Sequence, residues 1–435
     1  MAKGPTASPP TGSMMSLRGA VFLGIGAMVG AGIFSLLGTT AEVAGSAVWL
    51  SFALAGGIAA LQGYSFAKLG ARYPTAGGLL EYVNKGYGIG HVATIVAWLT
   101  YAANIIVTAM VAVSFGSYAS DAIAGGDPVW VKGLAVALVV VMTGLNVAGS
   151  TLVAKVQSLI VFVVIGILAF FAIVTISAID PALIAPSTYP SARDIVSGVA
   201  LTFFAFLGFG VVTFPAKDLK DPSCQLPRAM TIAIGLAAVI YIAVSLGVLG
   251  TLGVEKVIAA GPTAIAVAAQ PILGDLGYWL MLITALFATS GATNAGLYPA
   301  AGLTEHLTST GQWPTGMSGR VGPVPTGLFV VAVAVIVMVL FFDLSAIASI
   351  GSAVALMIFG LVSFGHLRIR ADTGANLVIL LAAVATTVIT LVTFALTTLI
   401  KEPASIATLV GIVIASAILD VTWSRSRERG ATASV

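Results

Sequence analysis

Hydrophobic stretches of about twenty residues, separated by short polar segments, run through almost the whole chain. A helix that crosses a membrane needs about 20 mostly apolar residues. The polar punctuation predicts about twelve such spans, at residues 18–38, 46–67, 91–117, 131–150, 155–178, 194–215, 230–252, 277–300, 325–342, 346–367, 376–399 and 405–423. We therefore predict an all-α polytopic membrane protein.

The composition excludes other classes of protein. The chain is 59% hydrophobic and only 8% charged, whereas soluble domains carry about 25% charged residues. The net charge of +3 is spread along the chain and forms no basic patch, so no nucleic-acid partner is expected. One cysteine and three widely spaced histidines predict no metal site or cofactor. No HExxH motif or pair of intramembrane acids is present, so we do not expect an enzyme.

The charges between the spans predict the orientation. With both termini on one side, 15 of the 19 lysines and arginines lie on that side. The other four are Lys132, Arg193, Lys256 and Lys401. The positive-inside rule then predicts a multi-pass protein of the cell membrane with both termini in the cytoplasm. Residues 1–16 are expected to form a disordered tail, and residues 424–435 a second cytoplasmic tail.

Spans one and six are both interrupted by glycine near their middle. Span one has glycines at 24, 26, 30 and 32, and span six has glycines at 208 and 210. A packing face of small residues would explain Gly26 and Gly30 equally well. However, interrupted helices at corresponding positions of two halves are typical of transporters built from inverted repeats. The pairing therefore favours a substrate site between the two spans.

A broken helix exposes amides at one end and carbonyls at the other. The amide end suits an anion and the carbonyl end suits an ammonium group, so two facing breaks predict a site for a zwitterionic amino acid. Amides of Ala31 and Gly32 would bind the carboxylate, and carbonyls near Ala27, Met28 and Phe204 the amine. The full set of candidate substrate-binding residues is Ala27, Met28, Val29, Gly30, Ala31, Gly32, Asn104, Phe204, Leu207 and Gly208.

Two observations bear on this candidate set. Asn104, in the middle of span three, either contacts the pocket or forms an interhelical hydrogen bond. No carboxylate occurs in the middle of spans 1, 3, 6, 8 or 10. Because a cationic side chain would need a partner there, neutral amino acids are the expected substrates.

These motifs resemble the amino acid–polyamine–organocation (APC) superfamily of permeases. The similar segments are Gly26 to Phe34, Tyr64 to Gly78, Leu145 to Gly149, Phe203 to Arg228 and, as in a proton-coupled, broad-specificity archaeal member, Ala264 to Asn294. The resemblance implies a LeuT-type fold of 5+5 inverted repeats with discontinuous helices 1 and 6. The transport core would span 17–367, with repeats at about 17–178 and 194–367, and two peripheral helices would follow at 376–423. It also implies that Phe204 is the aromatic gate over the substrate.

The resemblance leaves the coupling ion open. In that archaeal permease a span-five lysine against the first helix carries the coupling proton, and Val164 stands at the matching position here. In sodium-coupled relatives, hydroxyls of span eight help to hold a cation, and Thr289, Ser290 and Thr293 are candidates for that role. The expected function is secondary active transport of amino acids, with neutral ones favoured, through the lipid bilayer by alternating access, with a proton or sodium as a possible coupling ion. An exchanger and a non-transporting sensor of the same fold are the alternatives.

Overall fold

The computed structural model describes residues 15–75, 78–88, 90–148, 151–309, 320–321 and 324–432. Within these ranges nearly every segment is helical, apart from an antiparallel pair of two-residue strands, β1 (Arg320–Val321) and β2 (Val324–Pro325). Residues 1–14 and 433–435, which belong to the expected tails, lie outside the described residues.

The first half of the chain contains the helices expected for spans one to five. They are α1 (Leu17–Ala31), α2 (Ile33–Ala44), α3 (Val48–Arg72), α4 (Leu79–Tyr87), α5 (His91–Ala124), α6 (Pro128–Ala148) and α7 (Thr151–Ile176). Short 3₁₀ turns follow α2 and α7, namely η1 (Gly45–Ala47), η2 (Pro181–Ile184) and η3 (Pro186–Thr188).

The second half contains the remaining spans. Its α-helices are α8 (Ala192–Phe204), α9 (Pro222–Leu252), α10 (Val254–Ala260), α11 (Ala264–Ser309), α12 (Thr326–Phe341), α13 (Leu344–Arg368), α14 (Arg370–Thr373), α15 (Leu377–Thr397) and α16 (Pro403–Thr432). Its 3₁₀ segments are η4 (Leu207–Asp218), η5 (Gly261–Thr263) and η7 (Leu399–Lys401).

The apolar helices account for every predicted span. By length and composition, nine helices of the described chain can cross a membrane, and three shorter apolar helices join them at Leu17–Gly30, Thr326–Phe341 and Pro403–Ile418. The 40-residue stretch Ile33–Arg72 holds the second part of span one together with span two. The prediction of a polytopic all-α membrane protein is therefore confirmed.

Some boundaries differ from those predicted. The helix of span eight begins early because α11 includes residues before a bend at Gly274, where φ is 66° and ψ is −161°. Only glycine adopts this conformation readily, so the spanning part starts just after the bend, as expected. The short helices α4 and α10 lie in segments that were expected to be loops, and α16 continues to Thr432 through most of the expected C-terminal tail.

The two halves pack with matching contacts. Helices five spans apart contact each other: α1 with η4, α3 with α9, α5 with α11 and α6 with α12. Other contacts occur twice, and the two versions are exchanged when every helix is replaced by the one five spans away. The contact α1–α9 then corresponds to α8–α3, α5–α13 to α11–α7, and α1–α7 to α8–α13. An offset of five spans reverses the direction of each matching helix. Inverted repeats would give this pattern of contacts, with the interrupted spans α1–α2 and α8–η4 as counterparts.

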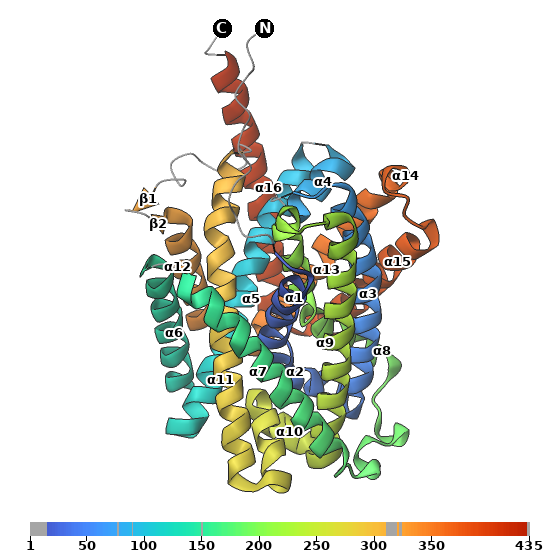
Figure 1. Cartoon of the computed structure of the whole chain (residues 1–435), viewed down its shortest axis with the longest axis vertical. Helices are drawn as coiled ribbons and strands as arrows, with labels where there is room; N and C mark the ends of the chain where they lie inside the picture. The colour runs from blue at the N-terminus through green and yellow to red at the C-terminus, as the bar shows by residue number, and fades with distance from the viewer. Residues whose placement is uncertain are drawn as a thin grey trace.

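The ends of the bundle are distinct in Figure 1. The connecting helices α4 and α14 lie at one end, where α16 also projects beyond the bundle, and α10 lies at the opposite end. Helix α13 is mostly buried, whereas α6, α7 and α15 leave most of their apolar surface outside the protein. Exposed Val140, Phe162, Ile173 and Val388 mark these outer faces, which suit contact with lipid tails.

Candidate functional site

The break in span one is centred on Gly32, which separates α1 from α2. Its φ of −90° and ψ of −80° depart from helical values. The amide of Gly32 nevertheless donates to the Met28 carbonyl at 2.8 Å. The expectation of a free Gly32 amide is therefore wrong in this conformation, because the hydrogen-bond ladder of α1 continues through the break.

The next helix supplies different amides. The Ser35 and Leu36 amides both donate to the Gly32 carbonyl, at 3.3 and 3.0 Å. A helix leaves its first amides without partners inside the helix, so Ile33 and Phe34 provide the amide end of this break. Of Ala31, the structure describes the backbone, which ends α1, and not the side chain.

The break in span six begins after Phe204, the last residue of α8. The Ala205 amide donates to the Thr202 carbonyl at 3.1 Å, and the Phe206 amide to the Phe203 carbonyl at 2.9 Å. From Leu207 the chain continues as the 3₁₀ segment η4. Long 3₁₀ segments are uncommon and often mark functional hinges. Span six is thus interrupted next to the glycines that predicted it.

The segment after the break of span six is in backbone contact with α1, four to five residues before the break at Gly32. A Cβ atom built on Gly208 would lie 2.5 Å from both the Met28 nitrogen and the Ala27 carbonyl carbon. No side chain fits between these backbones, which explains the glycine. The structure therefore brings together three residues of the candidate set, Ala27, Met28 and Gly208, with half-buried Leu207 beside them.

Phe204 lies inside the bundle and not at its lipid-facing surface. It is 2% exposed. A Cβ atom on Gly351 of α13 would lie 2.7 Å from the Phe204 ring atom Cε2 and 2.8 Å from a methyl carbon of Ile106 on α5. The ring thus occupies the meeting point of spans three, six and ten, next to the break.

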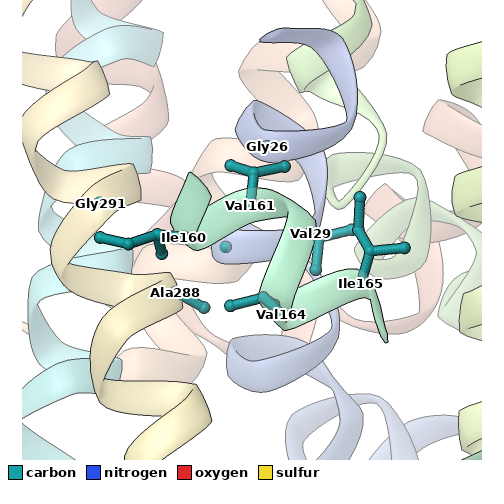
Figure 2. A pocket seen from close by; sticks show the side chains of 9 residues that line it. Gly26, Val29, Ile160, Val161, Val164, Ile165, Ala288 and Gly291 are labelled. Atoms are coloured by element: carbon teal, nitrogen blue, oxygen red, sulfur yellow. The ribbon is translucent and has the colours of Figure 1, made fainter. Parts of the chain in front are cut away.

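Val29 and Gly30 face the other side of span one. Figure 2 shows the surroundings of a narrow pocket between α1, α7 and α11, which Val161, Val164 and Ile165 of α7 help to line. Its lining consists of Gly26, Val29, Gly30, Ile160, Val161, Val164, Ile165, Ala288 and Gly291. Val29 and Gly30 are therefore separated from the face of α1 that meets span six.

The same pocket locates Val164. The valine is 4% exposed and lies across from the glycine face of α1. All nine lining residues are aliphatic or glycine, so no side chain of this lining titrates or binds a cation. Gly30 itself is pressed against α11, since a Cβ atom there would lie 2.6 Å from the Ala288 carbonyl oxygen.

The polar residues of spans three and eight mostly bond to helix backbone. Asn104 Nδ2 donates to the Gly296 carbonyl at 3.0 Å, which links α5 to α11. The Thr289, Ser290 and Thr293 hydroxyls donate to carbonyls four residues earlier in α11, at 2.6, 2.6 and 2.9 Å. Asn104 thus forms the interhelical bond that was the alternative to pocket contact. The hydroxyls retain their oxygen lone pairs, so a role in binding a cation stays a prediction.

Tyr241 of α9 joins the two breaks, and no sequence signal identified it. Its hydroxyl donates to the Ala205 carbonyl at 3.2 Å. A Cβ atom on Gly32 would lie 2.5 Å from the same hydroxyl oxygen. The side chain is fully buried. A single tyrosine in an apolar span does not by itself predict a role. However, the carbonyls freed by a helix break need hydrogen-bond donors, and a search of the neighbouring spans for hydroxyl side chains would have identified Tyr241.

Comparison with known proteins covers nearly the full chain. Residues 15–421 match the sequence model of a family described as amino acid permease. The chain is 32% identical over 417 residues to the inner membrane transport protein YbaT of Escherichia coli, covering 95% of this chain and 97% of that protein.

Two further relatives show how widely the similarity extends. The uncharacterized protein MJ0609 of Methanocaldococcus jannaschii is 32% identical over 370 residues, which cover 83% of this chain and 84% of that protein. The cationic amino acid transporter 3 of Arabidopsis thaliana is 27% identical over 375 residues, which cover 80% of this chain and 61% of that protein.

Proposed function

The chain belongs to the amino acid permease family, and we propose that it carries neutral α-amino acids across the cytoplasmic membrane by alternating access. Membership makes it a multi-pass membrane transporter and not an enzyme. The observation that carries the proposal is the backbone contact between Gly208, just after the break of span six, and Ala27–Met28, near the end of α1 and its break at Gly32. This contact places the interrupted regions of the two spans next to each other, and the substrate is proposed to bind beside it, where it would reach the ends of both broken helices.

The helix ends supply complementary partial charges. The amides of Ile33 and Phe34 begin α2 and suit the substrate carboxylate. At the end of α8, the Thr202 and Phe203 carbonyls accept backbone amides and the Ala205 carbonyl accepts Tyr241. The Phe204 carbonyl lies between those of Phe203 and Ala205 in the sequence, and it is the candidate acceptor for the substrate ammonium group.

The preference for neutral substrates follows from the surroundings. The described residues around the breaks include Met28, Gly32, Ile106, Ala205, Tyr241 and Gly351, with Phe204 as the proposed gate. All of these side chains are uncharged, and a cationic or acidic substrate side chain would lie among them without a countercharge. The Arabidopsis relatives are named for cationic amino acids, and we propose that this chain differs from them in substrate.

The apolar pocket at Val164 favours exchange as a second mode of action. A proton or sodium ion needs a titratable group or several oxygen ligands, and the lining of this pocket offers only hydrocarbon side chains. If the hydroxyls of Thr289, Ser290 and Thr293 bind no cation either, the carrier is driven by its substrates alone. We therefore propose amino-acid exchange as the alternative to ion-driven uptake.

Both termini are proposed to lie in the cytoplasm. The connections that carry Lys85 and Arg370 lie at the end of the bundle from which α16 projects (Figure 1). That grouping agrees with the excess of positive charge expected on the inner side.

Uptake into proteoliposomes tests the proposal. The panel contains labelled neutral, cationic and acidic amino acids, each with a proton gradient, a sodium gradient or a trapped internal substrate. Saturable uptake of neutral amino acids is expected, and the condition that drives it identifies the coupling. Uptake restricted to cationic amino acids would refute the proposed specificity. Binding without flux under every condition would show a sensor instead.

A further inference from the structure

We propose that Tyr241 is a positioning residue of the substrate site, whose hydroxyl holds the break of span six in register with the break of span one. This inference rests on the proposed function, because it takes the two breaks to be the place where an amino acid binds. Tyr241 belongs to α9, a third element that is continuous through this region. It is therefore suited to fix the two interrupted spans relative to each other.

The contacts of Tyr241 reach both breaks. Its hydroxyl donates to the Ala205 carbonyl at 3.2 Å, one residue after the end of α8. Gly32, at the break of span one, leaves room for the same hydroxyl, because a Cβ atom there would lie 2.5 Å from it. The Phe52 and Phe206 rings, with centroids at 5.3 and 5.1 Å, hold the tyrosine ring in place.

The Tyr241 hydroxyl provides a hydrogen-bond donor for a carbonyl that the break leaves without a partner in the helix. A carbonyl released from a helix inside a membrane has no water to bond to, and leaving it without a donor is costly. Tyr241 satisfies the Ala205 carbonyl with a neutral donor, so no charged group is needed at the site. The Phe204 carbonyl is then the one that faces the substrate ammonium group in the proposed site. Replacing Tyr241 by phenylalanine keeps the ring but removes the hydroxyl donor. This substitution therefore tests the contribution of the hydrogen bond while leaving the packing of the ring in place.

Transport kinetics of Tyr241→Phe provide the first test. We expect KM for a neutral amino acid to rise about 2- to 10-fold, the factor that corresponds to loss of one buried hydrogen bond. Vmax should change less than KM, because binding geometry is affected more than folding. Tyr118→Phe is the matched control. Tyr118 is also fully buried, but its hydroxyl has no hydrogen-bond partner among the described residues, so KM should stay unchanged.

A chemical probe gives a readout that needs no transport. The one native cysteine, exposed Cys224, is replaced by serine, and Leu207→Cys is introduced next to the break. The rate of alkylation by N-ethylmaleimide then reports how tightly the segment after Ala205 is held. We expect Tyr241→Phe to raise this rate at least about 2-fold, the smaller factor expected for one lost hydrogen bond. Tyr118→Phe should leave the rate unchanged.

The outcomes separate the two proposals. Unchanged KM and alkylation in Tyr241→Phe would overturn the positioning role and show that the tyrosine only fills space. Absence of amino-acid transport in the wild type would refute the proposed function, while faster alkylation in Tyr241→Phe would still establish the link between the breaks. If Tyr241→Phe does not accumulate in the membrane, Gly32→Ala gives a second test, since its methyl group would lie 2.5 Å from the hydroxyl, although also 2.7 Å from Ala205 Cβ. Faster alkylation at residue 207 is again expected, and an unchanged rate would overturn the positioning role.

Discussion

Two glycines one turn apart on α1 allow the packing of span one to be tested by a matched pair of substitutions. In Gly30→Ala the new methyl carbon would lie 2.6 Å from the Ala288 carbonyl oxygen and 2.6 Å from Ala292 Cβ. In Gly26→Ala the nearest atom is also at 2.6 Å, but it is a terminal methyl carbon of Val161. In both variants the new methyl carbon has its nearest neighbour at the same distance. The neighbour that must move is the backbone of α11 in Gly30→Ala and a single valine side chain in Gly26→Ala.

The expected free energies follow from that difference. Ordinary contact begins at 3.4 Å, so each methyl group is about 0.8 Å too close. At Gly30 the obstacle is the backbone of α11, and separating the two helices costs about 1–3 kcal/mol. At Gly26 the Val161 side chain borders the pocket of Figure 2 and can rotate, at about 0.5–1.5 kcal/mol. The gain in helix propensity, about 1 kcal/mol, applies to both variants and cancels in the comparison.

Thermal stability in detergent measures the difference. Gly30→Ala should lower the free energy of unfolding by about 0.5–1.5 kcal/mol relative to Gly26→Ala. It should therefore aggregate at a lower temperature when heated samples are analysed by size-exclusion chromatography. Equal stability of the two variants would refute the reasoning, because it would mean that α1 does not approach the α11 backbone at Gly30. A change in KM without loss of stability would instead assign Gly30 to the substrate site.

Three further predictions concern single side chains. Phe204→Ala removes the ring packed on Gly351 and should increase leak of trapped substrate, whereas Phe204→Leu should leak less; equal leak in wild type and both variants would argue against a gate. Asn104→Ala removes the hydrogen bond to Gly296 and should lower stability by about 0.6–2 kcal/mol with unchanged KM, and a raised KM at full stability would instead indicate pocket contact. Val164→Lys places a charge in an apolar pocket and should reduce the folded yield in the membrane far more than Val164→Met, so equal yields would show that the pocket is open to water or to a counterion.

The sequence predicted the broken helices correctly but not all of the groups that they expose. Gly32 and Gly208 identified the two interruptions, because glycine is the residue that permits departure from a helix and close approach of backbones. The Gly32 amide was expected to be free, yet it bonds to Met28. Composition alone does not say how many more hydrogen bonds a helix makes before it ends, and the amides expected to be available are instead the first two of α2, those of Ile33 and Phe34.

For the polar residues, too, the sequence predicted the need for a hydrogen bond but not the partner. Asn104 was identified as a residue that must have a partner, since an amide in the middle of a membrane span needs hydrogen bonds. Its actual partner, the Gly296 carbonyl, lies 192 positions away in the sequence and belongs to a different span. Tyr241 reaches Ala205 over 36 positions. Such bonds depend on which helices are neighbours, and local pattern does not contain that information.

The sequence by itself determined the number of spans, their places along the chain and the two points of interruption, because each depends on local hydrophobicity or on glycine. Only the tertiary structure decided which face of span one meets span six, at Ala27 and Met28, and which face meets spans five and eight, at Val29 and Gly30. The physical reason is the solvent. Lipid tails are as apolar as a protein core, so the inner and outer faces of a membrane helix have similar composition. Hydrophobic periodicity therefore identifies the helix but not its neighbours.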